Sequence, residues 1–266
     1  MTQFINHPDD TPLYAMQPLQ RFSDRAIDYA NYRPSYPIAA IAAILAGLGE
    51  PHRLVAADIG AGTGIASRLL ADQGLRVWAI EPNAAMREAG AFHTNVTFQS
   101  GSAEQTELLD ASVDLVTCFQ AFHWFDPALC LPDFHRILKP SGRLALVWNS
   151  RDRHDPFTQA YTQLVQALSD NHPAESRMVS TQPLLTNPYF GNISQHEFQY
   201  QQSLDLESLI GRAQSSSYVP KDDDTTQRLV SGLKALCDRW ADEQGQVRLV
   251  YTTQVFLAKA VREIQP

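Results

Sequence analysis

A glycine-rich segment gives the sequence its clearest chemical signal. Residues 55–64 read VAADIGAGTG, an apolar run that leads into three glycines and then into a helical pattern. Glycine lets the backbone adopt positive φ angles and approach a ligand closely, and a helix N-terminus presents N–H groups without partners in the helix. The segment predicts a ligand-binding turn made of Asp58, Gly60, Ala61, Gly62, Thr63 and Gly64.

The glycine spacing separates two classes of nucleotide ligand. Dinucleotide-binding loops read GxGxxG and hold pyrophosphate at the helix N-terminus, whereas this loop reads GxGxG. Asp58 precedes Gly60 by two residues, where a carboxylate would repel pyrophosphate and attract an ammonium group. The pattern therefore favours S-adenosylmethionine (SAM) over NAD. An ordinary tight turn between strand and helix is the alternative interpretation of the loop alone.

A second group of candidate residues follows the next predicted strand. Glu81 ends that strand, where its carboxylate would accept hydrogen bonds from both ribose hydroxyls. The alternative is a solvated glutamate that caps the next helix. Pro82 and Met86 would add apolar contacts to the adenine face, although Met86 alone is also typical of a core residue.

A third group, Ser102, Ala103 and Glu104, comes directly after the third predicted strand. A backbone N–H and an acidic side chain at this point would read the adenine edge. Alternatively, Ser102 would cap a helix and leave Glu104 exposed. Because ligands bind outside the carboxyl ends of parallel strands, the three groups together predict one cofactor site.

The elements that must position these residues alternate along the chain. Strands are predicted by the apolar runs at 54–59, 77–80, 96–99, 113–119 and 143–148. Helices are predicted at 37–48, 65–73, 84–89 and 128–138. This alternation is typical of an α/β fold with helices on both faces of a parallel sheet. Residues 155–190 and 205–245 are mostly helical by periodicity, with strands at 193–200 and in the middle of 247–260.

Together these motifs resemble class I SAM-dependent methyltransferases of the type 11 group. The resemblance rests on residues 58–64, Glu81, 101–104 and the LKPSGRL stretch at 138–144, and it covers residues 21 to about 150. Two further segments, from Phe22-Ser23 to Pro37 and QAFHWF at 120–125, resemble a trans-aconitate methyltransferase-like subgroup. The resemblance implies no metal. It implies a Rossmann-like, seven-stranded, mostly parallel sheet whose last strand is antiparallel, plus a helical cap.

The resemblance also implies three parts of the chain and roles for several residues. Residues 1–37 would form an N-terminal arm or lid over the cofactor, 38–150 the SAM-binding core, and 151–266 the helical cap with the last two strands. Arg33 would pair with a carboxylate of SAM or of the acceptor, and Gln120 would contact the cofactor. Tyr32, Trp124 and Tyr218 are the candidate substrate-binding residues.

His123 is the candidate general base, because an ordinary histidine pKa near 6.5 suits proton removal at neutral pH. A phenol, hydroxyl or amine acceptor would benefit from such a base, whereas a carboxylate would need none. The alternative is that His123 hydrogen-bonds the backbone while its neighbours pack. The chain lacks, after its fourth strand, the Asn/Asp-Pro-Pro-Tyr run of amide- and base-directed N-methyltransferases, which argues against DNA-adenine and protein-glutamine acceptors.

The composition of the chain limits the classes of partner that it is expected to bind. The 266 residues carry a formal net charge of −8, which disfavours nucleic acid. No secretory signal or apolar run of bilayer length is evident, and three cysteines without a CxxC pair indicate neither disulfides nor zinc. We expect a cytoplasmic enzyme with a small-molecule methyl acceptor, SAM as cofactor and S-adenosylhomocysteine (SAH) as product. A SAM-binding regulatory or inactive protein is the alternative; the acceptor, its O or N atom, the oligomeric state and the pathway stay open.

Overall fold

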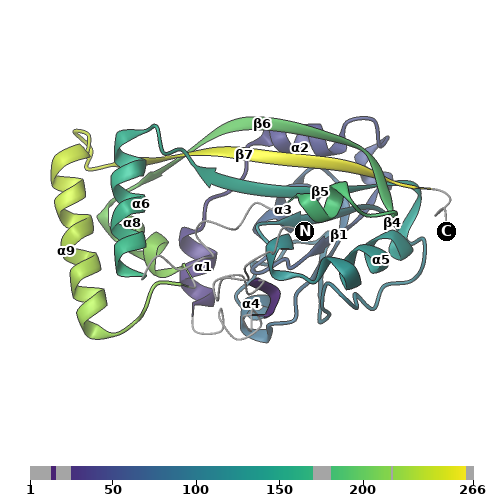
Figure 1. Cartoon of the computed structure of the whole chain (residues 1–266), viewed down its shortest axis with the longest axis horizontal. Helices are drawn as coiled ribbons and strands as arrows, with labels where there is room; N and C mark the ends of the chain where they lie inside the picture. The colour runs from purple at the N-terminus through teal and green to yellow at the C-terminus, as the bar shows by residue number, and fades with distance from the viewer. Residues whose placement is uncertain (1–12, 16–24, 170–180, 217, 262–266) are drawn as a thin grey trace, which may run out of the picture.

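One mixed β-sheet runs through the molecule (Figure 1). Its strand order is β3-β2-β1-β4-β5-β7-β6. The computed structural model describes residues 13–15, 25–169, 181–216 and 218–261. Phe22, Ser23 and most of the expected arm therefore lie outside the described residues. The strands are β1 Val55–Ile59, β2 Arg76–Ile80, β3 Val96–Gln99, β4 Val113–Phe119, β5 Leu138–Arg151, β6 Phe190–Leu204 and β7 Val247–Ala260.

Strands β1 to β5 pair in parallel, while β7 runs antiparallel to both β5 and β6. This confirms the predicted fold: a seven-stranded, mostly parallel α/β sheet whose last strand is antiparallel. The chain leaves β1 toward β2 on one side and returns as β4 on the other. The switch point between β1 and β4 is where open α/β sheets bind ligands.

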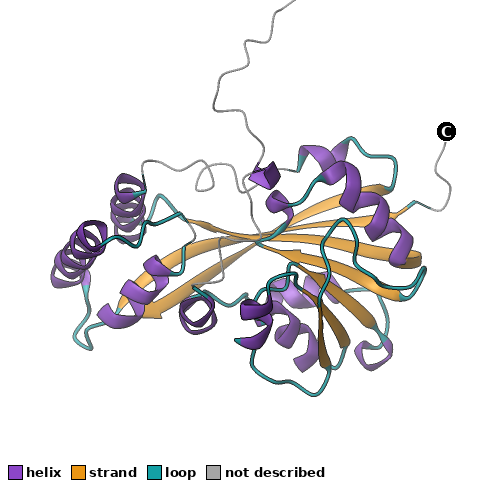
Figure 2. Cartoon of the chain, turned by 90° about the horizontal axis from the view of Figure 1, so that it is seen from below, coloured by secondary structure: helices purple, strands orange, loops and turns teal. Residues whose placement is uncertain are grey.

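Helices cover both faces of the parallel part (Figure 2). On one face, α2 (Ile38–Leu45) and α3 (Ile65–Asp72) bury apolar side chains such as Ile41 and Leu70 against the sheet. On the other face, α5 (Pro127–Ile137) and α7 (Gln182–Leu185) pack around Phe134 and Leu184. The two covered faces explain why β4 reads as a continuous apolar run.

The long strands β6 and β7 extend beyond the parallel part and carry a helical cap at one end (Figure 1). The cap helices are α6 (Pro156–Leu168), α8 (Leu206–Gln214) and α9 (Asp223–Trp240). They enclose a core of their own around Tyr161, Leu209 and Leu233. Helix α1 (Ala26–Tyr32) packs against α8, so the segment before the sheet touches the cap.

Several boundaries differ from those expected from sequence. Strand β5 begins at Leu138, five residues before the predicted start, because Leu138 pairs with Val113 before a register shift. Strand β6 is longer than 193–200, since it follows β7 over its whole length.

The remaining short elements are helix α4 (Ala84–Glu88) and the 3-10 turns η1 (Leu13–Ala15), η3 (Pro51–Arg53) and η4 (Phe122–Trp124). No helix of the described ranges is long and apolar enough to cross a membrane.

Candidate active site

The glycine loop joins β1 to α3 at the switch point of the sheet. Gly60 and Gly62 have φ angles of +68° and +58°, which side-chain-bearing residues rarely adopt. A Cβ on Gly60 would lie 2.8 Å from the Cβ of Ala121, and a Cβ on Gly62 would lie 3.2 Å from the Cε of Met86. The loop therefore needs glycine for its backbone angles and for the space that it leaves open.

The backbone N–H groups of this loop are used within the protein. Gly60 and Ala61 both donate to the carbonyl of Ile80, Gly64 donates to Ala61, and Gly62 donates to the Glu81 carboxylate. These four N–H groups belong to the loop and to the N-cap before α3, and they hold the turn in place.

Asp58 lies at the end of β1 and is 1% exposed. Its carboxylate accepts hydrogen bonds from the Ser67 hydroxyl at 2.6 Å and from the Thr117 hydroxyl at 2.9 Å. Burial raises the pKa of Asp58 to about 6, and the two hydroxyls oppose that rise. The carboxylate is thus held rigidly without a cationic partner among these bonds, so a cation placed beside it would favour its charged form.

Glu81 follows β2 and joins three segments. Its Oε2 accepts from the N–H of Gly62 at 2.9 Å, and its Oε1 accepts from the N–H of Asn83 at 2.9 Å. Burial raises the pKa of Glu81, while these two N–H groups lower it. Asn83 is the residue that caps α4, by accepting from the N–H of Met86. Glu81 is therefore neither solvated nor the helix cap.

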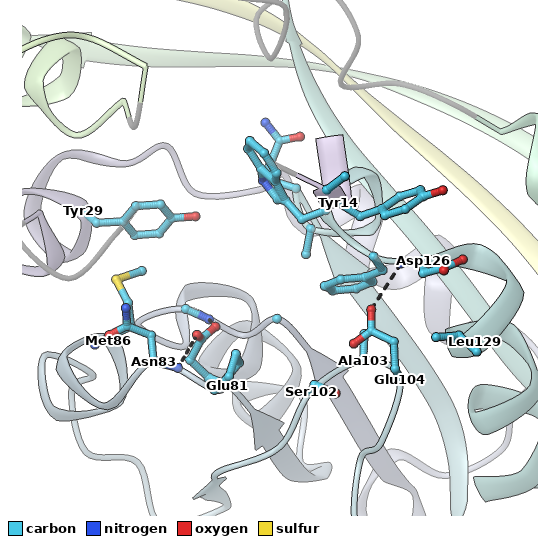
Figure 3. Close-up of a pocket in the computed structure, with 18 residues that line it drawn as sticks. Tyr14, Tyr29, Glu81, Asn83, Met86, Ser102, Ala103, Glu104, Asp126 and Leu129 are labelled. Atoms are coloured by element: carbon cyan, nitrogen blue, oxygen red, sulfur yellow. Dashed lines mark hydrogen bonds between the residues drawn. The ribbon is translucent and has the colours of Figure 1, made fainter. Parts of the chain in front are cut away.

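The segment after β3 is an irregular loop, so Ser102 does not begin a helix. Ser102 instead accepts from the N–H of Gln105 at 3.2 Å. The Glu104 carboxylate accepts from the N–H of Asp126 at 3.1 Å, on the same side of the cavity (Figure 3). This bond ties the β3 loop to the start of α5 and closes one wall of the site.

A cavity of about 600 Å³ opens between these segments (Figure 3). Ten predicted site residues line it: Gly60, Gly62, Glu81, Pro82, Met86, Ser102, Ala103, Glu104, Gln120 and Trp124. Eight further residues line it: Tyr14, Ala15, Tyr29, Asn83, Ala121, Phe125, Asp126 and Leu129. The volume lies within the range of small-molecule sites.

A second, much smaller cavity adjoins the glycine loop. It has about 20 Å³ of accessible space and is lined by Asp58, Ala61 and Arg33. Tyr29, Gly60 and Gln120 line both cavities. Tyr29 comes from the aromatic segment before the sheet, and its position between both cavities depends on the packing of α1, which has no local sequence signal.

Gln120, directly after β4, combines a φ of +53° with a fixed side chain. Its side-chain amide donates to the carbonyl of Asn149 at 3.3 Å, and its Oε1 accepts from the N–H of Asn149 at 3.1 Å. Positive φ at a residue other than glycine clusters at functional sites, where the surroundings hold it in place. The two hydrogen bonds with Asn149 hold Gln120 in this conformation, at the carboxyl end of β4 beside β5.

Five predicted residues lie outside the lining of both cavities: Tyr32, Thr63, Gly64, His123 and Tyr218. Gly64 is the N-cap of α3. The Tyr32 ring packs directly on Gly211 of α8, and the Tyr218 hydroxyl accepts from Arg151 at 2.8 Å. Both tyrosines are therefore engaged with the cap.

His123 lies in η4 and is held by a neighbouring indole. The Nε1 of Trp148 donates to its Nδ1 at 3.3 Å. Burial, together with the nearby Arg33 guanidinium, lowers the pKa of His123 to about 3. The imidazole is therefore neutral at physiological pH and is a weak base.

Comparison with known proteins identifies the family. The model of a methyltransferase domain matches residues 57–146, the span from the glycine loop to β5. An uncharacterized methyltransferase of Mycobacterium tuberculosis is 34% identical over 192 residues, which is 71% of this chain and 74% of the relative. An uncharacterized methyltransferase-like protein of Schizosaccharomyces pombe is 29% identical over 90% of this chain and 94% of its own length.

A solved structure supports the same family. A protein assigned as a type II methyltransferase from Anaeromyxobacter dehalogenans superposes with a TM-score of 0.66 at 25% identity, over 86% of this chain and 98% of that chain. The chain belongs to the methyltransferase family. It is a SAM-dependent enzyme, so SAM is the ligand against which the cavity must be judged.

The residues of this methyltransferase fit SAM. Each oxygen of Glu81 accepts one bond from the backbone, and a carboxylate has capacity for about four, so acceptors remain for ribose hydroxyls. Any side chain at Gly62 would press on Met86 beside the cavity. Asp58 supplies a buried carboxylate near the glycine loop, where an ammonium group would be stabilised.

Proposed function

We propose that this methyltransferase transfers the methyl group of SAM to an oxygen or nitrogen nucleophile of a small molecule, with a carboxylate as the favoured acceptor. One observation carries the proposal. The 600 Å³ cavity extends from the cofactor residues Glu81 and Met86 to Trp124 and Asp126 on the far wall. It therefore offers room for an acceptor beside the cofactor.

Bound SAM supplies an electrophilic methyl group on a positively charged sulfur. Glu81 would hold the ribose, and Ser102, Ala103 and Glu104 would line the adenine end. Arg33, Asp58 and Gln120 would surround the amino-acid end, since all three line the smaller cavity. The protein's main contribution is to hold donor and nucleophile in line at short distance.

A carboxylate acceptor agrees with the state of His123. A carboxylate is already deprotonated at neutral pH and attacks without a base, whereas an alcohol or amine must lose a proton. A base works best when its pKa is near the working pH, and the pKa of His123 is about 3. His123 stays our candidate base only for a non-carboxylate acceptor.

The resemblance to the trans-aconitate methyltransferase-like subgroup gives this proposal its finer form. The QAFHWF segment follows β4, and Trp124 lines the cavity. Small polycarboxylic acids are therefore the first acceptors to test. The competing proposal, a SAM-binding protein without turnover, requires a filled acceptor space. Phe122, Trp124 and the N-terminal arm are the candidates to fill it. Phe122 is buried in the core, while Trp124 and, from the arm, Tyr14 and Ala15 line the cavity.

The first experiment is calorimetric titration with SAM, SAH and NADH in parallel. We expect micromolar binding of SAM and SAH and none of NADH. Radiolabelled SAM is then incubated with small carboxylic acids, and methyl ester formation is measured. Binding of SAM without transfer to any carboxylate, alcohol or amine would favour the regulatory alternative, while failure to bind SAM or SAH would contradict the assignment of the cavity.

A further inference from the structure

A group of arginines lies where the segment after α1, the end of β5 and helix α8 meet. Arg212 of α8 is 4% exposed. The guanidinium of Arg33 lies close enough for Arg212 to lower its pKa, in addition to the effect of burial. Arg151 donates to the hydroxyls of Thr162 and Tyr218 and lies over the ring of Tyr161. Positive charge is therefore concentrated around the buried guanidinium of Arg212.

Three polar atoms of this group are buried without a hydrogen-bond partner: Arg33 Nε, Arg212 Nε and Tyr161 Oη. The two guanidiniums form few hydrogen bonds within the described residues. Arg212 donates to the Ser216 hydroxyl at 3.3 Å, and Arg33 donates to the carbonyl of Ser215 at 2.8 Å. Buried polar atoms nearly always have partners, so three unmatched atoms in one group indicate a missing acceptor.

Arg25 shows what a purely structural arginine looks like at the same place. Its guanidinium donates to the carbonyls of Gln214, Ser216 and Val219 and so fastens the start of α1 to the end of α8. Arg212 receives no such set of carbonyls. Neither Arg212 nor Arg33 forms an ion pair within the described ranges.

Burying a cation without an anionic partner is costly. An oxyanion would relieve that cost, because a guanidinium pairs well with a carboxylate or phosphate and the Tyr161 hydroxyl would add a donor. The group also borders the cofactor site, since Arg33 lines the small cavity beside Asp58 and Gly60.

We propose that Arg212, together with Tyr161 and beside Arg33 of the cofactor end, binds an acidic group of the methyl acceptor and so selects small oxyanions as substrates. This inference rests on the proposed function, because it assigns the acceptor's charge. It makes Arg212 and Tyr161 specificity-determining residues that lie outside the lining of both described cavities, next to Arg33, which lines the smaller one.

The test is thermal unfolding with and without SAH, in the presence of succinate, citrate or inorganic phosphate at constant ionic strength. Neutral succinamide is the ligand control. The variants are Arg212→Met and Tyr161→Phe, which removes only the unmatched hydroxyl. Arg228→Gln is the matched control, because Arg228 is an exposed arginine of cap helix α9.

We expect at least one acid, and not succinamide, to raise the melting temperature of the wild type and of Arg228→Gln. Arg212→Met should lose this shift, and Tyr161→Phe should bind the acid roughly tenfold more weakly, as for a lost bond to a charged group. Without ligand, Arg212→Met should melt at or above the wild-type temperature, because it removes an unpaired buried charge. If Arg212 were purely structural, Arg212→Met would instead melt at a lower temperature than the wild type.

Carboxylate and phosphate acceptors are distinguished by which acid gives the shift. Equal shifts in wild type and Arg212→Met, or no shift with any acid in a wild type that SAH stabilises, would overturn the anion site alone. A wild type stabilised by acids but not by SAH would leave the anion site standing and contradict the proposed function.

Discussion

The carboxylate of Glu81 accepts a hydrogen bond from the backbone N–H of Gly62, with 2.9 Å between Oε2 and N. The same side chain accepts from Asn83 at the start of α4. Glu81 thus connects the end of β2, the glycine loop and the next helix. A residue expected to bind ribose therefore also fixes the glycine loop, which we propose supports the cofactor.

We predict that Glu81→Ala lowers the affinity for SAH by about 1.5–3 kcal/mol, the usual range for hydrogen bonds to a charged group. The loss combines the ribose acceptor with the support of the loop. Calorimetric titration measures it, and Glu88→Ala, at an exposed position of α4, is the control. An unchanged affinity in folded Glu81→Ala would remove Glu81 from the cofactor site.

Gly62 and Gly245 allow backbone strain to be separated from loss of the site. Both have positive φ angles, +58° and +74°, but a Cβ on Gly245 meets nothing within 4 Å, whereas one on Gly62 meets Met86. Alanine at either position should cost roughly 1–2 kcal/mol of stability from the left-handed backbone. Only Gly62→Ala should also weaken SAH binding, and Gly62→Val should abolish it. Equal SAH affinities for the two alanine variants would show that the loop does not need an open Gly62.

The parallel core could be predicted from sequence because its signals are local. Apolar runs covered on both faces mark β1 and β4, and the glycine spacing marks the turn after β1. Because the strands are parallel, their carboxyl ends lie at the same edge of the sheet. Ten of the residues expected at the site line one cavity at that edge.

The remaining parts depend on distant contacts. Tyr29 reaches both cavities only because α1 packs against α8, which is far away in sequence. Tyr32 and Tyr218 look alike as aromatic candidates, yet packing directs both toward the cap. The sequence does not predict that β5 begins at Leu138, because only a register shift after Val113 lets the Lys-Pro-Ser-Gly stretch continue the strand.

Asp58 should make the stability of the ligand-free protein depend on pH. Its pKa of about 6 in the folded protein lies above its ordinary value of 3.8. Between these values the folded state holds a proton that the unfolded chain has lost, so stability falls as pH rises through this window. Above pH 6 the full cost of about 3 kcal/mol is present, from roughly two pKa units.

Asp58→Asn removes that charge and keeps the shape of the side chain, since the Ser67 and Thr117 hydroxyls can act as donors or acceptors. We predict that it melts at a higher temperature than the wild type at pH 8 and that the difference disappears near pH 4. Unfolding curves between pH 4 and 8 measure this. Parallel pH dependence of the two proteins would mean that Asp58 does not titrate in this range.

His123 supplies the last prediction, because its hydrogen bond specifies a protonation state. Trp148 Nε1 is a donor only, so the Nδ1 that it contacts must be the acceptor and the proton lies on Nε2. With a pKa of about 3, the imidazole should stay neutral from pH 5 to 8. Nitrogen–proton correlation NMR identifies its signals by their loss in His123→Gln. Signals that hold still over this range agree with a carboxylate acceptor, whereas a titration near pH 6.5 would restore His123 as a general base.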